Sequence, residues 1–394
     1  MSQPSRRPAL DKSSRPPAER RKPVALHVAV ASEDQSYPVL IGPGLLARLG
    51  HELKRSHANA RRVALVSDAN VMPLYGEQAR ASLEAEGFEV HAFTIPAGEV
   101  HKTIEQLVGV TEGMLAGGLG RRDVLVALGG GVVGDLAGLA AALFMRGIGF
   151  LQCPTSLLAQ VDASVGGKVA VDLPAGKNLL GAFHFPSVVV IDPEVLQTLP
   201  DRELGCGLAE MLKHGALFSR DHFNQVVEAS ERIYARDTEV LGRMIASSVA
   251  LKAACVSRDP RELGEAGKGR VLLNLGHTVG HALERLSGYA LLHGEAVGLG
   301  LIAAARLSAR KGLAEPDLEQ QMRAAVASLR LPSDLDHWLG SVTPGQLENT
   351  LSNDKKRDFA SITYIALARI GEPTVISSSA SEIVALLRDP SPGC

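Results

Sequence analysis

One short run, VLVALGGGVVGD from Val124 to Asp135, limits more than any other how this chain can fold. Its first half is uninterrupted aliphatic sequence, which is typical of a strand buried on both faces of a parallel sheet. The glycines at 129–131 make a tight turn, and we expect a helix to start at Val132. A strand that passes through a glycine turn into a helix predicts an α/β fold with helices on both faces of the sheet.

The same turn is a candidate nucleotide-binding site. Gly129, Gly131 and Gly134 match the spacing GxGxxG, and the first turn of the following helix offers backbone N–H groups to a pyrophosphate. Any tight strand-to-helix turn can use glycine, so the spacing alone leaves a purely structural turn equally open. Polar groups that suit a ribose or a phosphate are available at Glu99, Lys102 and Asp135.

The chain of 394 residues exceeds what one hydrophobic core usually organises, and its pattern changes once. Strands and helices alternate from residue 23, beginning with a hairpin, whereas long helical patterns dominate after residue 192. We expect the later helices at 203–218, 241–258, 271–286, 296–311 and 380–387, and one short strand at 361–366. The sequence thus predicts an α/β N-terminal domain with a parallel nucleotide-binding sheet at 23–192, followed by a mostly α-helical metal-binding domain at 193–394.

Composition limits the partners and the cellular compartment that we expect for the protein. Residues 1–22 are rich in Pro, Ser and Arg, and we expect them to form a disordered tail. The formal charge of −2 argues against nucleic acid or an anionic membrane as the main partner. No apolar run of about eighteen residues free of Gly and charge is present, and the N-terminus lacks an apolar secretory segment. The four cysteines form no CxxC pair, so we expect reduced thiols and a cytoplasmic protein.

Three histidines lie close together in residues 270–294. If this stretch is helical, His277, His281 and Glu284 share one face, and His293 follows soon after. A lone histidine is more often a core residue, but three in so short a stretch favour a metal or acid–base site. Spacing of i, i+4 lets two imidazoles converge on one ion, so geometry alone makes both His277 and His281 ligands.

A carboxylate that completes such a site is available in the run LAEMLKHG at 208–215. Glu210, Lys213 and His214 share a helical face there, and Glu210 is the best candidate for a ligand from a second helix. Two histidines and one glutamate, with a position left for a substrate oxygen, describe a catalytic metal site. The alternative is an i, i+3 ion pair between Glu210 and Lys213 without a metal.

Charged side chains in the otherwise apolar stretch 145–181 point to an anionic ligand, because charges are rarely buried unless they are paired or bound. The charged and amide residues of interest are Arg146, Asp162, Lys168, Lys177 and Asn178. Lys168 follows a double glycine and Lys177 follows a proline and a glycine, so we expect both on loops. Internal ion pairs are the alternative. A last charge run, at 353–357, is expected to be a solvated turn.

Taken together, these motifs make the chain similar to the 3-dehydroquinate synthases of the sugar phosphate cyclase superfamily. The most specific pieces are GGGVVGD, PTSLLAQVDASVGGKVAV, GKNLLGAF, GLAEMLK, LNLGHTVGHALE and LHGEAV, in that order, within a resemblance that covers residues 23–387. It implies a nicotinamide domain followed by a helical metal domain, with the substrate in the cleft between them. It also implies NAD and one divalent metal, zinc or cobalt, as cofactors, and a homodimer.

The activity implied by this resemblance is that of an NAD- and metal-dependent carbon–oxygen lyase acting on phosphate. The small-molecule sugar phosphate 3-deoxy-arabino-heptulosonate 7-phosphate would give 3-dehydroquinate and phosphate, a step of the shikimate pathway towards chorismate and the aromatic amino acids. The implied steps are transient oxidation by NAD, phosphate elimination, reduction, ring opening and intramolecular aldol closure. Two alternatives are another sugar phosphate cyclase, whose substrate has no carboxylate, and a metal-dependent alcohol dehydrogenase of related fold. Arg270 discriminates between the cyclases, because a carboxylate partner is expected only if the substrate carries that group.

Carried over position by position, the resemblance assigns the metal to Glu210, His277 and His293. His281, which spacing alone made a ligand, would face the substrate phosphate instead. Contacts with NAD are assigned to Glu99, Lys102, Gly131, Gly134, Asp135, Thr155, Ser156, Lys168, Lys177 and Thr198. Contacts with the substrate are assigned to Arg146, Asp162, Lys168, Asn178, Lys213, Lys252, Arg270 and Asn274, and to Lys355 or Lys356.

Overall fold

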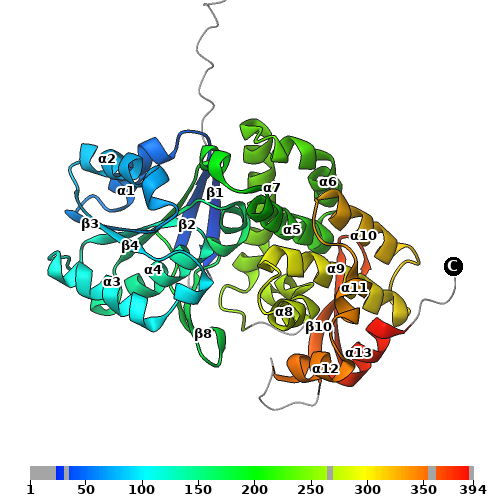
Figure 1. Ribbon diagram of the computed structural model, residues 1–394. Coiled ribbons are helices and arrows are strands. Elements are labelled where there is room, and N and C mark those ends of the chain that lie inside the picture. The colour runs from blue at the N-terminus through cyan, green and yellow to red at the C-terminus, as the bar shows by residue number, and fades with distance from the viewer. Residues whose placement is uncertain (1–23, 31–34, 264–268, 354–360, 390–394) are drawn as a thin grey trace, which may run out of the picture.

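The computed structural model describes residues 24–30, 35–263, 269–353 and 361–389. The predicted tail at 1–22 and the two lysines Lys355 and Lys356 lie outside the described residues. The described chain forms two lobes side by side (Figure 1): a sheet lobe, residues 24–191, and a helical lobe, residues 193–389.

A seven-stranded sheet in the order β1-β2-β9-β6-β5-β3-β4 forms the centre of the sheet lobe. Its strands are β1 Val24–Val30, β2 Gln35–Ile41, β3 Arg62–Asp68, β4 Glu89–Ile95, β5 Val124–Gly129, β6 Gly149–Pro154 and β9 Val188–Ile191. The β1–β2 pair is antiparallel, and the other neighbouring pairs are parallel. The predicted hairpin and parallel sheet are therefore confirmed.

Helices cover both faces of this sheet, as predicted. They are α1 Leu49–Ser56 and α2 Glu77–Ala85 on one face, and α3 Ile104–Ala116 and α4 Gly131–Leu143 on the other. The central strand β5 is buried at every residue because its side chains alternate between the two layers. Leu125 packs with α3 and α4, whereas Val126 packs with α1 and α2. The uninterrupted aliphatic run is thus explained by burial on both sides.

A two-stranded hairpin, β7 Lys168–Leu173 and β8 Gly176–Phe183, extends from this lobe (Figure 1). Lys168 and Lys177 lie on its strands, so the prediction that they lie on loops is wrong. Val169 and Val171 are buried in the core against α4, and this packing outweighs the loop tendency of the neighbouring glycines and proline.

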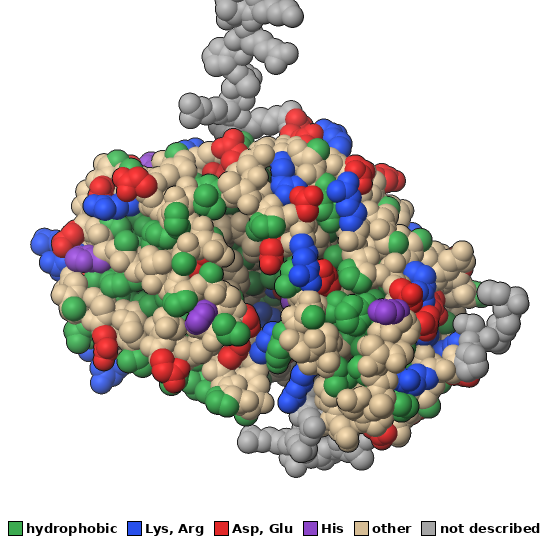
Figure 2. All heavy atoms as spheres, in the orientation of Figure 1, with side chains coloured by type: hydrophobic (Ala, Val, Ile, Leu, Met, Phe, Trp, Pro, Cys, Tyr) green, Lys and Arg blue, Asp and Glu red, His purple; other side chains and the backbone are tan. Residues whose placement is uncertain are grey.

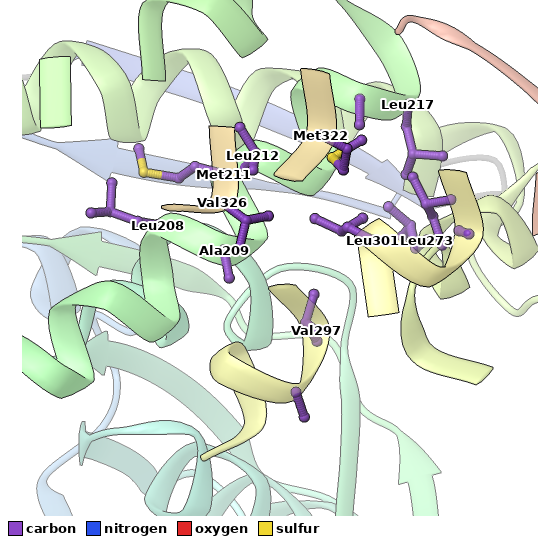
Figure 3. Close-up of a cluster of buried hydrophobic side chains, with 14 of the residues drawn as sticks. Leu208, Ala209, Met211, Leu212, Leu217, Leu273, Val297, Leu301, Met322 and Val326 are labelled. Carbon is purple, nitrogen blue, oxygen red and sulfur yellow. The ribbon is translucent and has the colours of Figure 1, made fainter. Parts of the chain in front are cut away.

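The helical lobe consists of nine α-helices and one β-hairpin among the described residues. They are α5 Asp201–Phe218, α6 Arg220–Tyr234, α7 Thr238–Arg258, α8 His277–Leu286, α9 His293–Arg310, α10 Leu318–Ser328, α11 Leu335–Gly340, α12 Pro344–Asn353, α13 Ala380–Arg388, β10 Ile362–Arg369 and β11 Glu372–Ser378. Figure 3 shows part of the core, where Leu212 of α5, Leu301 of α9 and Met322 of α10 belong to one apolar cluster. The mostly helical second half is confirmed.

Short 3-10 or π turns connect many of these elements. They are η1 Leu46–Arg48, η2 Met72–Gly76, η3 Glu99–His101, η4 Phe144–Arg146, η5 Ala159–Ala163, η6 Pro193–Thr198 and η7 Arg270–Asn274. The core of the helical lobe includes Tyr37 and Val39 of β2 and Ile191 of β9, so the apolar packing is continuous between the lobes. A domain boundary at residue 192 stays a prediction.

The single helix expected at 271–286 is wrong. Residues 270–274 form η7, Gly276 takes a left-handed φ of 79°, and α8 begins at His277. A side chain at Gly276 would lie within 3.2 Å of the backbone of α9, so packing against α9 forces this break. His277 and His293 consequently stand at the first positions of two neighbouring helices.

The helix α7 is long and apolar enough to cross a membrane by length and composition alone. It packs against β1, α5 and α6 and carries the buried Lys252, as a core helix of a folded domain does.

Candidate active site

Three helices bring Glu210, His277 and His293 together between the lobes. Their candidate ligand atoms lie within 4.8 Å of one another. The Oε1 atom of Glu210 is 3.1 Å from His293 Nε2 and 3.8 Å from His277 Nε2. Its Oε2 atom is 2.5 Å from Lys213 Nζ. The ion pair and the metal ligand, which were alternatives in the sequence, thus use different oxygens of one carboxylate.

Close helix packing sets these distances. A side chain at Gly294, next to His293, would lie 2.2 Å from the Cα atom of Cys206 on α5. A side chain at Gly300 would lie 1.8 Å from the carbonyl oxygen of Gly276, just before α8. Because both positions are glycine, α9 approaches α5 and α8 closely enough for three side chains from separate helices to converge.

The protonation states of Glu210 and His277 suit a divalent cation. Burial and the Lys213 ammonium hold the pKa of His277 well below its usual value, and its Nδ1 faces the Leu275 carbonyl at 3.1 Å, which leaves Nε2 as a lone-pair donor. Burial raises the pKa of Glu210, but Lys213, His293 and His277 together outweigh burial and keep the carboxyl ionised. One carboxylate oxygen and two imidazole nitrogens form a donor set that fits zinc or cobalt.

His281 lies at the rim of this cluster. Its ring centroid is 4.9 Å from that of His277 and 5.7 Å from that of His293, and its side chain is exposed. Glu210 belongs to one group of close donor atoms with His277 and His293 and to another with Asp162 and His214, whereas His281 groups with Glu284 and His293. The structure therefore brings the three imidazoles together but does not pair His281 with Glu210, as i, i+4 spacing alone had suggested.

A second buried cluster joins α7 to η5. Lys252 donates hydrogen bonds to the carbonyl oxygen of Asp162 at 2.5 Å and to its Oδ1 at 2.6 Å. The same Oδ1 lies 3.5 Å from His214 Nε2, and His214 Nδ1 lies 2.7 Å from Ser248 Oγ. Burial lowers the pKa of Lys252 to about 8 despite Asp162. This ammonium therefore titrates near neutral pH.

Two further cations adjoin this cluster. Arg270 is buried, and its Nη1 donates to the carbonyl oxygens of Gly166 at 2.7 Å and Pro260 at 3.0 Å. Gly166 has a φ of 114°, and a side chain there would lie 2.4 Å from Arg270 Nη2. Lys168 forms an ion pair with Glu262. The alternative of internal ion pairs is therefore present for Asp162, which pairs with Lys252, whereas the pair of Lys168 is exposed.

On the side of the sheet lobe, four predicted cofactor and substrate residues meet. The buried Lys102 Nζ is 2.8 Å from Asp135 Oδ2, 3.5 Å from Glu99 Oε1 and 2.5 Å from Asn178 Oδ1. Burial raises the pKa of Asp135 to about 6, although Lys102 opposes the shift. Asn178 takes a left-handed φ of 58°, which directs it from the hairpin into this group.

The glycine turn leaves the start of α4 accessible to a ligand. This 13-residue helix begins at Gly131, one residue before the predicted start, and has no side-chain cap. Ser156 Oγ lies 3.5 Å from the position that a side chain at Gly130 would occupy, and Thr155 N donates to Gly129 O. Uncapped N–H groups at a helix N-terminus, beside a serine hydroxyl, fit a pyrophosphate.

Gly134 and Thr198, the remaining glycine and hydroxyl predicted to contact NAD, have other neighbours. A side chain at Gly134 would contact the amide of Gln152 at 3.1 Å, so α4 packs closely on β6. Thr198 Oγ1 is 2.7 Å from Tyr75 Oη.

Lys177 connects the two lobes. Its Nζ donates a 2.7 Å hydrogen bond to Glu284 Oε1 on α8 and lies 4.6 Å from the ring centre of Tyr289. Figure 2 shows that the surface is hollowed between the lobes and that basic side chains lie around this hollow. The predicted cofactor residues of one lobe therefore face the predicted metal ligands of the other.

Some predicted residues are not joined to this group. Arg146 is exposed at a φ of 72°, and among the described residues it forms no hydrogen bond or ion pair with Asp162 or Lys168. Asn274 ends η7 and lines a small cavity with Tyr364 of β10.

Sequence reasoning assigned no role to Glu262 or Glu284. The sequence did place Glu284 on the helical face of His277 and His281, which was a usable signal. Nothing local marked Glu262, because its partner Lys168 is distant in the chain.

The chain is similar to known proteins over most of its length. The family model for the 3-dehydroquinate synthase N-terminal region matches residues 92–206, and that for the C-terminal region matches residues 207–357. A 3-dehydroquinate synthase from Symbiobacterium thermophilum is 46% identical over 343 residues, which cover 87% of this chain and 94% of that protein.

Solved structures of sugar phosphate cyclases are also similar. A 2-deoxy-scyllo-inosose synthase in complex with carbaglucose-6-phosphate, NAD+ and Co2+ has a TM-score of 0.81 and 25% identity, covering 93% of this chain and 99% of that chain. A 2-epi-5-epi-valiolone synthase from Streptomyces hygroscopicus subsp. jinggangensis, with NAD+ and Zn2+ bound, has a TM-score of 0.79 and 27% identity, covering 91% and 97%.

Proposed function

Because the chain belongs to the 3-dehydroquinate synthase family, we propose that it converts 3-deoxy-arabino-heptulosonate 7-phosphate to 3-dehydroquinate and phosphate. The observation that carries this proposal is the double use of Glu210. One of its oxygens faces two imidazoles and the other faces the buried Lys213, so a metal site adjoins a cation suited to an anionic substrate.

NAD and one zinc or cobalt ion are the cofactors that the site would hold. Glu210, His277 and His293 would bind the cation, and the start of α4 at Gly131 with Ser156 would bind the pyrophosphate of NAD. When bound, the nicotinamide supplies reversible hydride transfer and the cation supplies Lewis acidity.

The side chains of the chain itself would bind the two anionic ends of the substrate. Arg270 and Lys252 would bind the carboxylate, since they adjoin Asp162 beside the metal site. Asn274 and His281 would bind the phosphate, with Lys168, Asn178 and Lys213. Fixed contacts at both ends orient the sugar for phosphate loss and for ring closure.

Incubation of the purified protein with NAD, a divalent metal and the heptulosonate phosphate tests this function. We expect release of one phosphate per dehydroquinate formed, without accumulation of NADH, because hydride returns to the substrate. Stoichiometric NADH would support the alcohol dehydrogenase instead. Activity only on a heptulose phosphate without a carboxylate would support the other cyclase.

The proposed assembly is a homodimer in the cytoplasm. Leu179 and Phe183 are exposed on the same side of β8, and we call this side the hairpin face; Leu173 and Leu180 are also exposed on this hairpin. Apolar side chains gathered on one hairpin favour coverage by another protein surface, and a second copy is the proposed occupant. Cys153, Cys206 and Cys255 are buried free thiols, in agreement with a reducing compartment.

A further inference from the structure

We propose that Glu284 is a positioning residue that holds the His293 ring in the orientation and tautomer required for binding the divalent metal. This inference rests on the proposed metal site and adds to it a residue that was not among the predicted ligands. The observation behind it is that the two nitrogens of one imidazole face two different carboxylates.

The two ring nitrogens of His293 have different neighbours. Its Nε2 lies 3.1 Å from Glu210 Oε1, whereas its Nδ1 lies 3.8 Å from Glu284 Oε2. The two ring nitrogens point in diverging directions, so one ion cannot bind His293 through Nε2 and contact Glu284 as well. A carboxylate on the Nδ1 side favours the tautomer with the proton on Nδ1, which leaves the Nε2 lone pair for the ion and makes the ring a stronger ligand.

His277 shows the same arrangement with a different acceptor. Its Nδ1 is 3.1 Å from the carbonyl oxygen of Leu275, and its Nε2 faces Glu210. Both imidazoles therefore present Nε2 to Glu210 and use Nδ1 for support. The backbone supports His277, which begins α8, and the side chain of Glu284 supports His293, which begins α9.

Glu284 is itself held in place from the other lobe. Its Oε1 accepts the 2.7 Å hydrogen bond from Lys177, whose ammonium also lies over the ring of Tyr289. The carboxylate is 6% exposed, and a buried carboxylate requires such partners. With Oε1 fixed by the sheet lobe, Oε2 is directed at His293, so the metal site depends on a contact with the lobe proposed to bind NAD.

Metal binding by full-length variants without substrate tests this role. We expect Glu284→Gln, which keeps the shape and removes the charge, to weaken cobalt(II) affinity about 10- to 100-fold. The tetrahedral visible spectrum of the cobalt-loaded protein should persist with shifted bands, because all three ligands remain. His277→Ala, which removes a ligand, should lose that spectrum.

The matched control is Glu52→Gln. Glu52 lies on α1 of the sheet lobe, is similarly buried and pairs with Arg48 and Arg55. This variant should lower the midpoint temperature of unfolding but keep the cobalt affinity within about twofold, because the substitution removes no contact of a predicted metal ligand.

Two results would overturn the inference: unchanged cobalt affinity in Glu284→Gln, or loss of the tetrahedral spectrum as in His277→Ala, which would make Glu284 a ligand. Phosphate release by the unmodified protein is measured separately. If that activity were absent while Glu284→Gln still weakened cobalt binding, the proposed function would fail and the positioning role would stand.

Discussion

At the scale of single residues, the buried ionisable groups of the site shift one another's pKa values. Asp162 stays ionised because Lys252 and Lys213 outweigh the effect of burial on its pKa. The pKa of Lys252 is also lowered, to about 8, because burial and Arg270 outweigh Asp162, and for an ammonium this shift disfavours the charged form. Of the cations proposed to bind the substrate, Lys252 is therefore one whose charge changes near neutral pH.

This titration predicts an alkaline limit on activity. Below pH 8 Lys252 carries its proton and binds an anionic substrate, and above pH 8 it loses the charge. We expect kcat/KM to fall about tenfold per pH unit above pH 8, measured from phosphate release between about pH 6.5 and 9.5. Lys252→Arg, whose charge persists throughout this range, should abolish the decline even if its maximal rate is lower.

The matched control is Lys311→Arg, because Lys311 pairs with Glu382 at the surface far from this cluster in the chain. Its profile should keep the decline of the unmodified protein. An alkaline limb that persists unchanged in Lys252→Arg would show that another group causes it.

At the scale of secondary-structure elements, the metal site is a product of how closely helices approach. Gly294 touches the backbone of Cys206, one turn before Glu210, so this contact sets the distance between α9 and α5. The glycine carries no chemistry of its own, yet it lets the imidazole of His293 reach the carboxylate of Glu210.

Gly294→Ala should therefore harm both stability and metal binding. The new methyl group would lie 2.2 Å from Cys206 Cα, so α9 has to move away. We expect a loss of about 1–3 kcal/mol of unfolding free energy, measured by denaturant titration, and a lower zinc content after dialysis. Gly109→Ala on α3 is the control, since nothing lies within 4 Å of the new methyl group.

The control should gain up to about 1 kcal/mol, because alanine favours a helix over glycine. Its zinc content should match that of the unmodified protein. Equal zinc content in both variants would contradict the role assigned to the α5–α9 contact.

At the scale of the whole molecule, the hairpin face predicts the assembly. Leu179 is 60% exposed there, so we expect Leu179→Asp to place a carboxylate in the dimer interface. Burial of an unpaired charge costs about 2 kcal/mol or more, which weakens dimerisation about 30-fold. Analytical ultracentrifugation of the Leu179→Asp variant at low micromolar concentration should show monomers. Leu74→Asp, at a similarly exposed site on η2, should remain dimeric.

A monomeric unmodified protein, or a Leu179→Asp variant that dimerises normally, would contradict the proposed interface.

Local pattern alone determined the class of the fold and most of the chemically relevant residue types. An aliphatic run ending in glycines at 129–131 specifies a buried strand, a turn and a helix, because each step depends on neighbours in the chain. The alternation of strand and helix before residue 192, and its replacement by helices afterwards, follow from the same periodicities. Glu210, Lys213 and the histidines were visible as candidates because their chemistry is a property of the side chain.

Only the tertiary structure decided how these residues combine. Spacing along the sequence paired His277 with His281, but packing of α9 against α5 and α8 brings His293 to Glu210 instead. The break at Gly276 and the contact between Lys177 and Glu284 likewise depend on elements far apart in sequence. The physical reason is that local pattern specifies how a segment folds, whereas the distance between two side chains on different segments is set by the packing of everything between them.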